Sequence, residues 1–278
     1  MPGYLTKQES IAVAGVGNLT IRSLLDKQQF ADPLGLAEGL GISSAAWPLF
    51  GLLWPSGAYL AARLALRPVR AGERILEVGC GLALASLVGH RRGADVTASD
   101  CHPLAQAFLA ENLRLNHLLP MKYRHGHWGA AAVPAPTLAN ALLAPVDPPV
   151  QGLFDLIIGS DLLYERDEAG HLARFIGAHA SASAEVWIVD PDRGNRGAFN
   201  RQMDLHGFDR TESNLSGPGL PGDAPALRYK GRLLRYQRTR PDRSGPAPSS
   251  PAAALAASTL TPRPARPPPR RHRSATTG

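Results

Sequence analysis

A short segment, Arg74-Ile75-Leu76-Glu77-Val78-Gly79-Cys80-Gly81, constrains the fold of this chain more than any other. Its apolar residues predict a buried strand. Gly79 and Gly81 predict a sharp turn that a ligand can approach closely, because glycine has no Cβ. A helical pattern follows, and the strand-like residues 94–99 then end in Asp100. A carboxylate at that position can accept hydrogen bonds from a ribose, so the pattern predicts a nucleoside-binding unit.

Strand and helix patterns alternate along most of the chain. Apolar runs predict strands at residues 73–78, 94–99, 121–125, 154–159, 184–189 and 227–236. Helix-period apolar residues lie between them, at 58–66, 82–90, 103–116 and 168–180. This alternation predicts an α/β fold, with a doubly wound, mostly parallel, Rossmann-like sheet covered by helices on both faces. In such a sheet, ligands bind beyond the carboxyl ends of the strands.

Three regions are expected along the chain. Residues 1–53 form an N-terminal extension that covers the site, with a candidate strand at 19–25 and a loop at 41–48. Residues 54–238 form the ligand-binding domain, with an Ala- and Pro-rich loop or insertion at 130–150. Residues 239–278 are rich in Pro, Ala, Ser and Arg, and they carry too little large apolar surface to order themselves. We expect a disordered basic tail there.

The net charge of +7 lies almost entirely in this tail, where seven arginines stand against one aspartate from residue 240 onward. The rest of the chain is nearly neutral, so nucleic-acid binding is not expected except weakly through the tail. The two cysteines, Cys80 and Cys101, offer neither a disulfide framework nor a metal-ligand cluster. No apolar run is long enough to span a bilayer, and no secretory signal is recognisable. The chain is therefore expected in the cytoplasm, without a membrane partner.

The residues around the glycines favour one class of cofactor. A dinucleotide-binding turn would carry a third glycine where Leu84 stands. Glu77 also precedes the first glycine by two residues, and a carboxylate there suits a cationic ligand better than a pyrophosphate. S-adenosylmethionine carries an amino group and a sulfonium. We therefore predict S-adenosylmethionine as the cofactor and no metal.

At this point the sequence resembles the class I, seven-strand S-adenosylmethionine-dependent methyltransferases, and within them bacterial-type members of the family 16 lysine methyltransferases. The resemblance runs over roughly residues 19–208. Trp54-Pro55-Ser56-Gly57 resembles the pre-motif Trp segment of this family, and residues 77–83 resemble its E-x-G-x-G-x-G loop, with Ala83 in place of the last glycine. The resemblance makes 54–238 the methyltransferase domain. It implies cofactor binding by Trp54, Glu77, Gly79, Cys80, Gly81, Asp100, Trp128 and Ser160.

Gly159-Ser160-Asp161-Leu162-Leu163-Tyr164 is similar to the D-x-x-Y signature of the same family. The similarity implies that Asp161 faces the substrate and anchors an incoming ammonium, and that Tyr164, one helical turn on, walls its aliphatic stem. Glu165-Arg166 and Asp190-Pro191-Asp192-Arg193 resemble a subgroup that includes the lysine methyltransferases of electron transfer flavoprotein β-subunits. That subgroup usually carries glycine where this chain has Asp192, so the identity of the substrate does not transfer.

Three functions remain open at this stage. Protein-lysine N-methylation is the leading hypothesis, a small-molecule N-methyltransferase is the second, and a non-catalytic binding module that uses the basic tail is the third. Structural interpretations also compete with the site assignments. Glu77 can cap a neighbouring loop, Asp100 can cap the helix near residue 103, and the tryptophans can be core residues. His102, His117, His125 and His127 show no ligand spacing and are expected to be surface or core residues.

Overall fold

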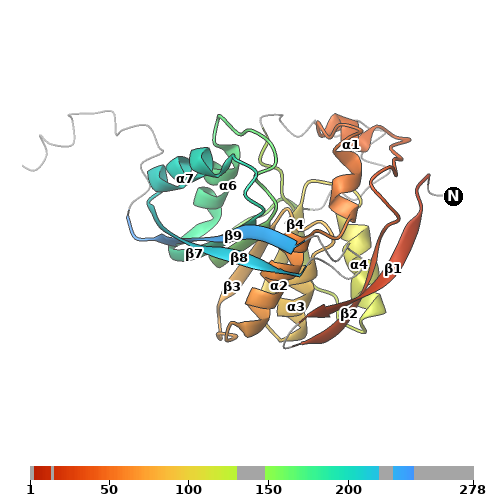
Figure 1. Ribbon diagram of the computed structural model, residues 1–278, viewed down its shortest axis with the longest axis horizontal. Coiled ribbons are helices and arrows are strands. Elements are labelled where there is room, and N and C mark those ends of the chain that lie inside the picture. Colours follow the sequence, from red (N-terminus) through yellow and green to blue (C-terminus); the bar gives the residue numbers. More distant parts are fainter. Residues whose placement is uncertain (1–2, 14–15, 130–147, 219–227, 241–278) are drawn as a thin grey trace, which may run out of the picture. The chain divides into compact units, whose positions relative to one another are not determined.

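The computed structural model describes residues 3–13, 16–129, 148–218 and 228–240. These residues all belong to one compact unit that spans Met1–Ser244 (Figure 1). Its strands are β1 Thr6–Val13, β2 Gly17–Leu24, β3 Arg74–Val78, β4 Asp95–Asp100, β5 Lys122–His125, β6 Phe154–Ser160, β7 Ala180–Asp190, β8 Phe208–Pro218 and β9 Arg228–Arg238. Its helices are α1 Leu36–Gly39, the 3-10 helix η1 Trp47–Gly51, α2 Pro55–Leu66, α3 Leu84–Arg91, α4 Ala105–Leu115, α6 His171–His179 and α7 Arg196–Leu205.

Seven strands form the main sheet, in the order β5-β4-β3-β6-β7-β9-β8. β3 to β7 are parallel, and β9 runs antiparallel to both β7 and β8. The sequence prediction of a doubly wound, mostly parallel sheet is confirmed, and the six predicted strands correspond to β3, β4, β5, β6, β7 and β9. β4 lies on one side of β3 and β6 on the other, so the chain reverses its direction of growth at β3. Ligands bind beside such a switch point in α/β sheets.

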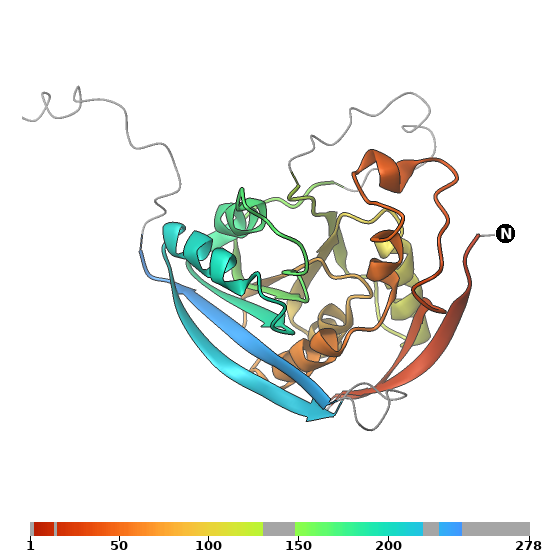
Figure 2. The ribbon, with the colours of Figure 1, turned by 45° about the horizontal axis from the view of Figure 1, so that its top comes forward.

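The core consists of two layers, one on each face of the main sheet. Alternate residues of a strand point to opposite faces. Ile75 and Leu156 pack with the buried faces of α2, α3 and α4, whereas Leu76 and Ile157 pack with α6 and α7. α6 and α7 lie side by side (Figure 2). β3 is therefore buried on both faces, and its carboxyl end meets the turn at Gly79 in the middle of the sheet.

The N-terminal hairpin of β1 and β2 forms a separate two-stranded sheet beside α4 (Figures 1 and 2). Asn112 of α4 and Asn116, the C-cap residue of that helix, hold it. Asn112 Oδ1 accepts a hydrogen bond from the Arg22 backbone N–H at 2.8 Å, and Asn116 Oδ1 accepts one from the Thr20 N–H at 2.9 Å. The free edge of β2 is thereby paired with side chains instead of another strand. The predicted strand at 19–25 corresponds to β2, whereas β1 was not predicted.

Two further elements were missed by the sequence pattern because each buries little apolar surface. β8 is the outer strand of the main sheet and pairs with β9 alone, and most of its described side chains are exposed. Charged, exposed residues are usual in such edge strands and remove the apolar alternation that identifies a strand. The buried residues of α7 are Phe199, Asn200 and Met203, too few for a clear helical period.

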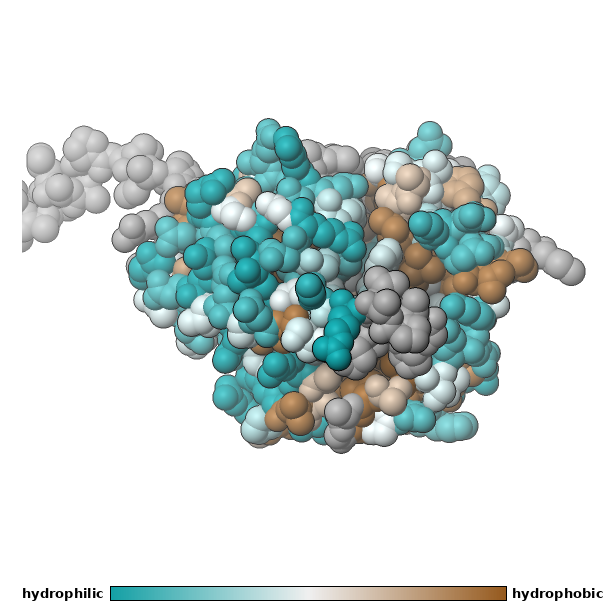
Figure 3. Space-filling model, in the orientation of Figure 1, coloured by the Kyte–Doolittle hydropathy of each residue, from teal (hydrophilic) through white to brown (hydrophobic). Residues whose placement is uncertain are grey.

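Part of the sequence prediction falls outside the described residues: 130–147 of the expected loop, and 241–278 of the expected tail. Arg240 lies within the described part, where its guanidinium donates to Asp204 Oδ1 at 2.7 Å. Within the described ranges, none of the helices is both long and apolar enough to cross a bilayer. On the face seen in Figure 3, hydrophilic side chains gather over α6 and α7, and apolar ones lie beside α1 and the N-terminal hairpin.

Candidate active site

A cavity of about 310 Å³ lies at the carboxyl ends of β3, β4 and β6. Its volume falls at the lower end of the usual range for small-molecule sites. All ten residues predicted for the site line it: Trp54, Glu77, Gly79, Cys80, Gly81, Asp100, Trp128, Ser160, Asp161 and Tyr164. They come from separate segments of the chain that lie between Trp54 and Tyr164. The parallel sheet brings these segments together because their strands end at the same edge.

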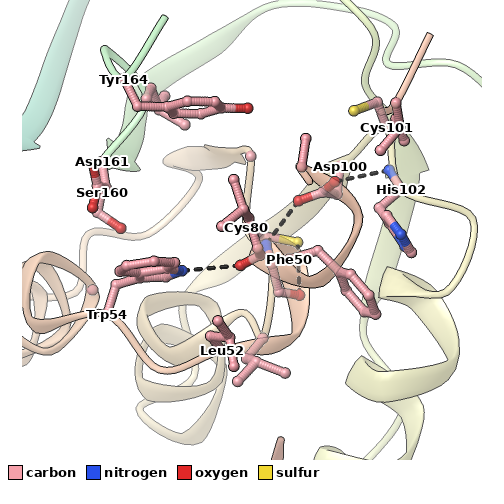
Figure 4. Close-up of a pocket in the computed structure, with 18 of the residues that line it drawn as sticks. Phe50, Leu52, Trp54, Cys80, Asp100, Cys101, His102, Ser160, Asp161 and Tyr164 are labelled. Atoms are coloured by element: carbon pink, nitrogen blue, oxygen red, sulfur yellow. Dashed lines mark hydrogen bonds between the residues drawn. The ribbon is translucent and has the colours of Figure 1, made fainter. Parts of the chain in front are cut away.

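Figure 4 shows how the walls of this cavity are divided. Ser160, Asp161 and Tyr164 lie on one side of the cavity. Asp100, Cys101 and His102 lie on the opposite side. Trp54 lies below, and its indole N–H donates to the Leu49 carbonyl at 2.9 Å (Figure 4). The pocket therefore has an aromatic floor supplied by the segment that precedes α2, and acidic groups on two facing walls.

The glycine turn is tighter than the sequence suggests. Gly79 and Gly81 have φ values of 60° and 50°, in the left-handed region that favours glycine. A Cβ on Gly79 would lie 2.5 Å from Leu162 Cδ2, and one on Gly81 would lie 2.7 Å from the Phe50 carbonyl oxygen. Neighbouring groups therefore fill the space that a side chain on either glycine would need, while the turn itself still lines the cavity. Ala83, which replaces a glycine of the resembled motif, also has a positive φ of 59°.

Glu77 supports the start of α3. Glu77 is only 3% exposed. Its Oε2 accepts hydrogen bonds from the Ser86 backbone N–H at 2.8 Å and from the Ser86 hydroxyl. Burial raises the pKa of Glu77 to about 7, although the Ser86 hydrogen bonds act in the opposite direction. One oxygen of Glu77 thus binds the first turn of α3 and not a loop, while the residue also borders the cavity.

Glu77→Gln should stabilise the ligand-free protein at alkaline pH. The pKa of about 7 lies above the ordinary 4.5, so the folded state binds this proton more tightly than the unfolded state. Ionisation of Glu77 therefore lowers the free energy of unfolding as the pH rises from about 4.5 to about 7. Glutamine avoids this loss, and we expect a gain on the order of 2 kcal/mol at pH 8 that disappears near pH 4. Urea unfolding of both proteins across this range measures it, and a difference independent of pH would contradict it.

Asp100 holds the glycine turn from the neighbouring strand. Its Oδ2 accepts from the Gly81 N–H and its Oδ1 from the His102 N–H, each at 2.8 Å. Burial raises the pKa of Asp100, and these backbone hydrogen bonds oppose the rise. α4 begins at Ala105, and Leu104 occupies its N-cap position, so the interpretation of Asp100 as the cap of that helix is wrong.

Asp161 forms an ion pair at the end of β6. Arg193 Nη2 donates to Asp161 Oδ2 at 3.0 Å. The Arg193 guanidinium also lies 5.9 Å from the centroid of the Trp54 ring. Burial raises the pKa of Asp161, and the positive charge of Arg193 partly offsets this. Oδ1 is buried and has no hydrogen-bond partner among the described residues.

Tyr164 lines the cavity but does not lie on a helix, so the expected helical spacing from Asp161 is wrong. α6 begins only at His171, where Asp167 Oδ1 accepts the first backbone N–H at 2.9 Å. Tyr164 is 44% exposed. Partial burial raises the pKa of its phenol to about 12. Tyr164 is therefore a neutral phenol at physiological pH.

Phe50, His102 and Arg193 are among the lining residues that the sequence did not assign to the site. Phe50 and His102 stack with ring centroids 3.6 Å apart, and burial lowers the pKa of His102 to about 3. No spacing rule predicts this pair, because η1 brings Phe50 to β4 from a distant part of the chain. Arg193 belongs to the motif at residues 190–193, but nothing in the sequence indicated its contact with Asp161.

The charge of the cavity is negative. Among the described residues that line it, the carboxylates are Glu77, Asp100, Asp161 and Glu165, and Arg193 is the single guanidinium. Walls of one charge sign with low-dielectric surroundings concentrate ligands of the opposite sign. The arrangement therefore favours a cationic ligand.

Comparison with known proteins agrees with the fold. No family model matches the chain. The electron transfer flavoprotein beta subunit lysine methyltransferase of Danio rerio is 28% identical over 162 residues, 57% of this chain and 56% of that protein. The Rattus norvegicus protein of the same name is 27% identical over the same shares. The chain thus spans about half the length of the curated relatives it matches.

Among solved structures, a Streptococcus mutans protein assigned as a S-adenosylmethionine-dependent methyltransferase is similar, with a TM-score of 0.50 and 13% identity. The match covers 83% of this chain and 55% of that chain. At this level of identity the likeness shows the fold alone. The chain has the seven-strand, Rossmann-like fold of such methyltransferases.

Proposed function

We propose that this chain is an S-adenosylmethionine-dependent methyltransferase that acts on lysine side chains of a protein. The observation that carries the proposal is the cavity at the switch point, where the ten residues expected from the sequence meet. The similarity to curated lysine methyltransferases supports the choice of acceptor.

The residues of the cavity fit this cofactor. Its excess of carboxylates suits a sulfonium and an ammonium, and Phe50 and Trp54 supply apolar surface. We assign Asp100 to bind the ribose and Trp128 to lie beside the adenine. The backbone of the Gly79–Gly81 turn and of Ser160 is assigned to contact the cofactor. Glu77 adds negative charge from behind the turn. When bound, the cofactor supplies a methyl group on a good leaving group.

The task of the remaining residues is to prepare the acceptor. A lysine must lose a proton before it can act as a nucleophile, because its ordinary pKa is about 10.4. Desolvation in the cavity lowers that pKa. We assign Asp161 to hold the ammonium in line with the methyl group, since orientation of this kind removes several kcal/mol of barrier. Tyr164, neutral and beside Asp161, forms the wall for the lysine stem.

A second hollow supports a polypeptide acceptor. It has a volume of about 620 Å³ and shares Trp128, Leu162, Tyr164 and Glu165 with the first cavity. It extends from the Asp161 side toward α6 and α7, so a chain that presents a lysine to Asp161 has room beside it. We place the reaction in the cytoplasm, because both cysteines are free thiols.

Labelling in a lysate tests this function. The purified full chain is incubated with methyl-labelled S-adenosylmethionine and a cell lysate, and the labelled species are identified by mass spectrometry. We expect label on lysine residues of one or few proteins, and the electron transfer flavoprotein β-subunit is the first purified candidate to test. If only small amines are labelled, the acceptor is a small molecule and not a protein. If labelling does not exceed that seen with the Asp161→Asn variant, the proposed activity is refuted.

A further inference from the structure

The ion pair of Arg193 and Asp161 occupies the place that the proposed function gives to the acceptor. We propose that Arg193 is an internal competitor of the acceptor cation: its guanidinium holds Asp161 until an ammonium takes its place. Arg193 would thereby set how tightly, and how selectively, the site accepts a cationic side chain. The inference rests on the proposed function for the identity of the acceptor, but its test needs no methyl transfer.

Arg193 occupies the Asp161 carboxylate in this structure. Oδ2 accepts from Arg193 Nη2 at 3.0 Å, Oδ1 is buried, and the Asp161 side chain is only 11% exposed. An entering ammonium therefore meets a buried Oδ1 and an Oδ2 that is already paired with Arg193. A carboxylate in this partly buried setting attracts a cation more strongly than an exposed one, because solvent screens it less.

Arg193 is held less firmly than its neighbours in the chain and in space. Arg196 contacts Asp192 Oδ1 at 2.7 Å and Glu212 Oε2 at 3.7 Å, and Arg232 contacts the same two acids. For Arg193, the described contacts are the bond to Asp161 and the Trp54 ring. Its side chain is 45% exposed, and ion pairs with an exposed partner are weak. Arg193 can therefore leave at little cost.

The backbone around Arg193 is compatible with such a movement. Asp192 and Gly194, on either side of it, have positive φ values of 65° and 102°. Asp192 itself is tied to Arg196 and Arg232, so the base of the turn is fixed while the Arg193 side chain faces the cavity. Trp54 offers a ring face that binds any cation within about 6 Å. An ammonium that displaces Arg193 thus meets both a carboxylate and an aromatic face.

Binding of a lysine analogue without cofactor tests the proposal. The full chain is titrated with Nα-acetyl-lysine methylamide, and the dissociation constant is measured by NMR for the unchanged protein, Arg193→Gln and Arg193→Lys. We expect Arg193→Gln to bind the probe about three- to fivefold more tightly, because the competing charge is absent. Arg193→Lys should stay within about twofold of the unchanged protein, since it keeps the charge.

Three controls separate competition from other effects. The neutral Nα-acetyl-norleucine methylamide should gain nothing from Arg193→Gln. Arg63→Gln, which removes the same charge from an exposed position on α2, should not change binding of the lysine probe. Asp161→Asn should abolish the gain in the Arg193→Gln background. Thermal unfolding checks that each variant is folded.

Specific outcomes would overturn the proposal. Equal affinity of the unchanged protein and Arg193→Gln for the lysine probe would do so, as would an equal gain for the neutral probe. The absence of binding to Arg193→Gln at the solubility limit of the probe would also contradict it. Failure of the proposed function looks different, because methyl transfer would be absent while the lysine probe still bound more tightly to Arg193→Gln.

Discussion

Asp161→Asn should lower the turnover of lysine methylation by about a thousandfold, which corresponds to about 4 kcal/mol in the activation free energy. The variant removes the charge that we assign to the incoming ammonium, and truncation of one member of a buried charge pair typically costs 2–5 kcal/mol. Asparagine is a better replacement than alanine at this position because it disturbs the backbone less. Asp161 has a φ of 54°, which asparagine tolerates and alanine adopts only with strain.

The measurement is a comparison of turnover with cofactor affinity. Asp161→Asn and Asp161→Ala should both keep the S-adenosylmethionine dissociation constant, measured by calorimetry, within about threefold of the unchanged protein. Glu165→Gln removes a carboxylate from the same cavity but not the one paired with Arg193, and its loss of turnover should be far smaller. Turnover of Asp161→Asn close to that of the unchanged protein would place the acceptor elsewhere.

Asp100→Ala should weaken S-adenosylmethionine binding by about 30- to 100-fold, or about 2–3 kcal/mol. The substitution removes the carboxylate assigned to the ribose and also frees the Gly81 N–H and the His102 N–H that it now holds at 2.8 Å. The turn between β3 and α3 then loses its tie to β4. Hydrogen bonds to a charged acceptor are worth about 1.5–3 kcal/mol, so the loss of affinity should exceed that of a neutral contact.

Asp155→Ala is the matched control for this experiment. Asp155 Oδ2 also accepts a backbone N–H, that of Arg74 at 3.1 Å, but at the opposite end of the sheet. It should reduce stability without changing the dissociation constant of the cofactor. If the affinity of Asp100→Ala equals that of the unchanged protein, the assignment of this cavity to S-adenosylmethionine is wrong.

Much of the fold was accessible from the sequence because its strands are buried on one or both faces. β3 and β6 carry short apolar runs, and β4 alternates Val96 and Ala98 with polar residues. Polar residues such as Asp100 and Asp161 stand at or just after the carboxyl ends of these strands. β8 and α7 were missed for the opposite reason, since each is largely exposed and polar. The Tyr164 error has a local cause. The three-residue spacing of Asp161 and Tyr164 in the motif suggested a helical turn, but α6 begins only at His171, whose backbone N–H donates to Asp167.

The sequence by itself determined that the residues at the carboxyl ends of the parallel strands meet in the cavity, because parallel strands that alternate with helices must end at one edge of the sheet. It also determined the acidic character of the site, since Glu77, Asp100 and Asp161 stand at three of these ends. Only the tertiary structure decided what these groups touch. Phe50 against Gly81, Ser86 on Glu77 and Arg193 on Asp161 are contacts whose partners are set by packing in three dimensions, and no local spacing encodes them.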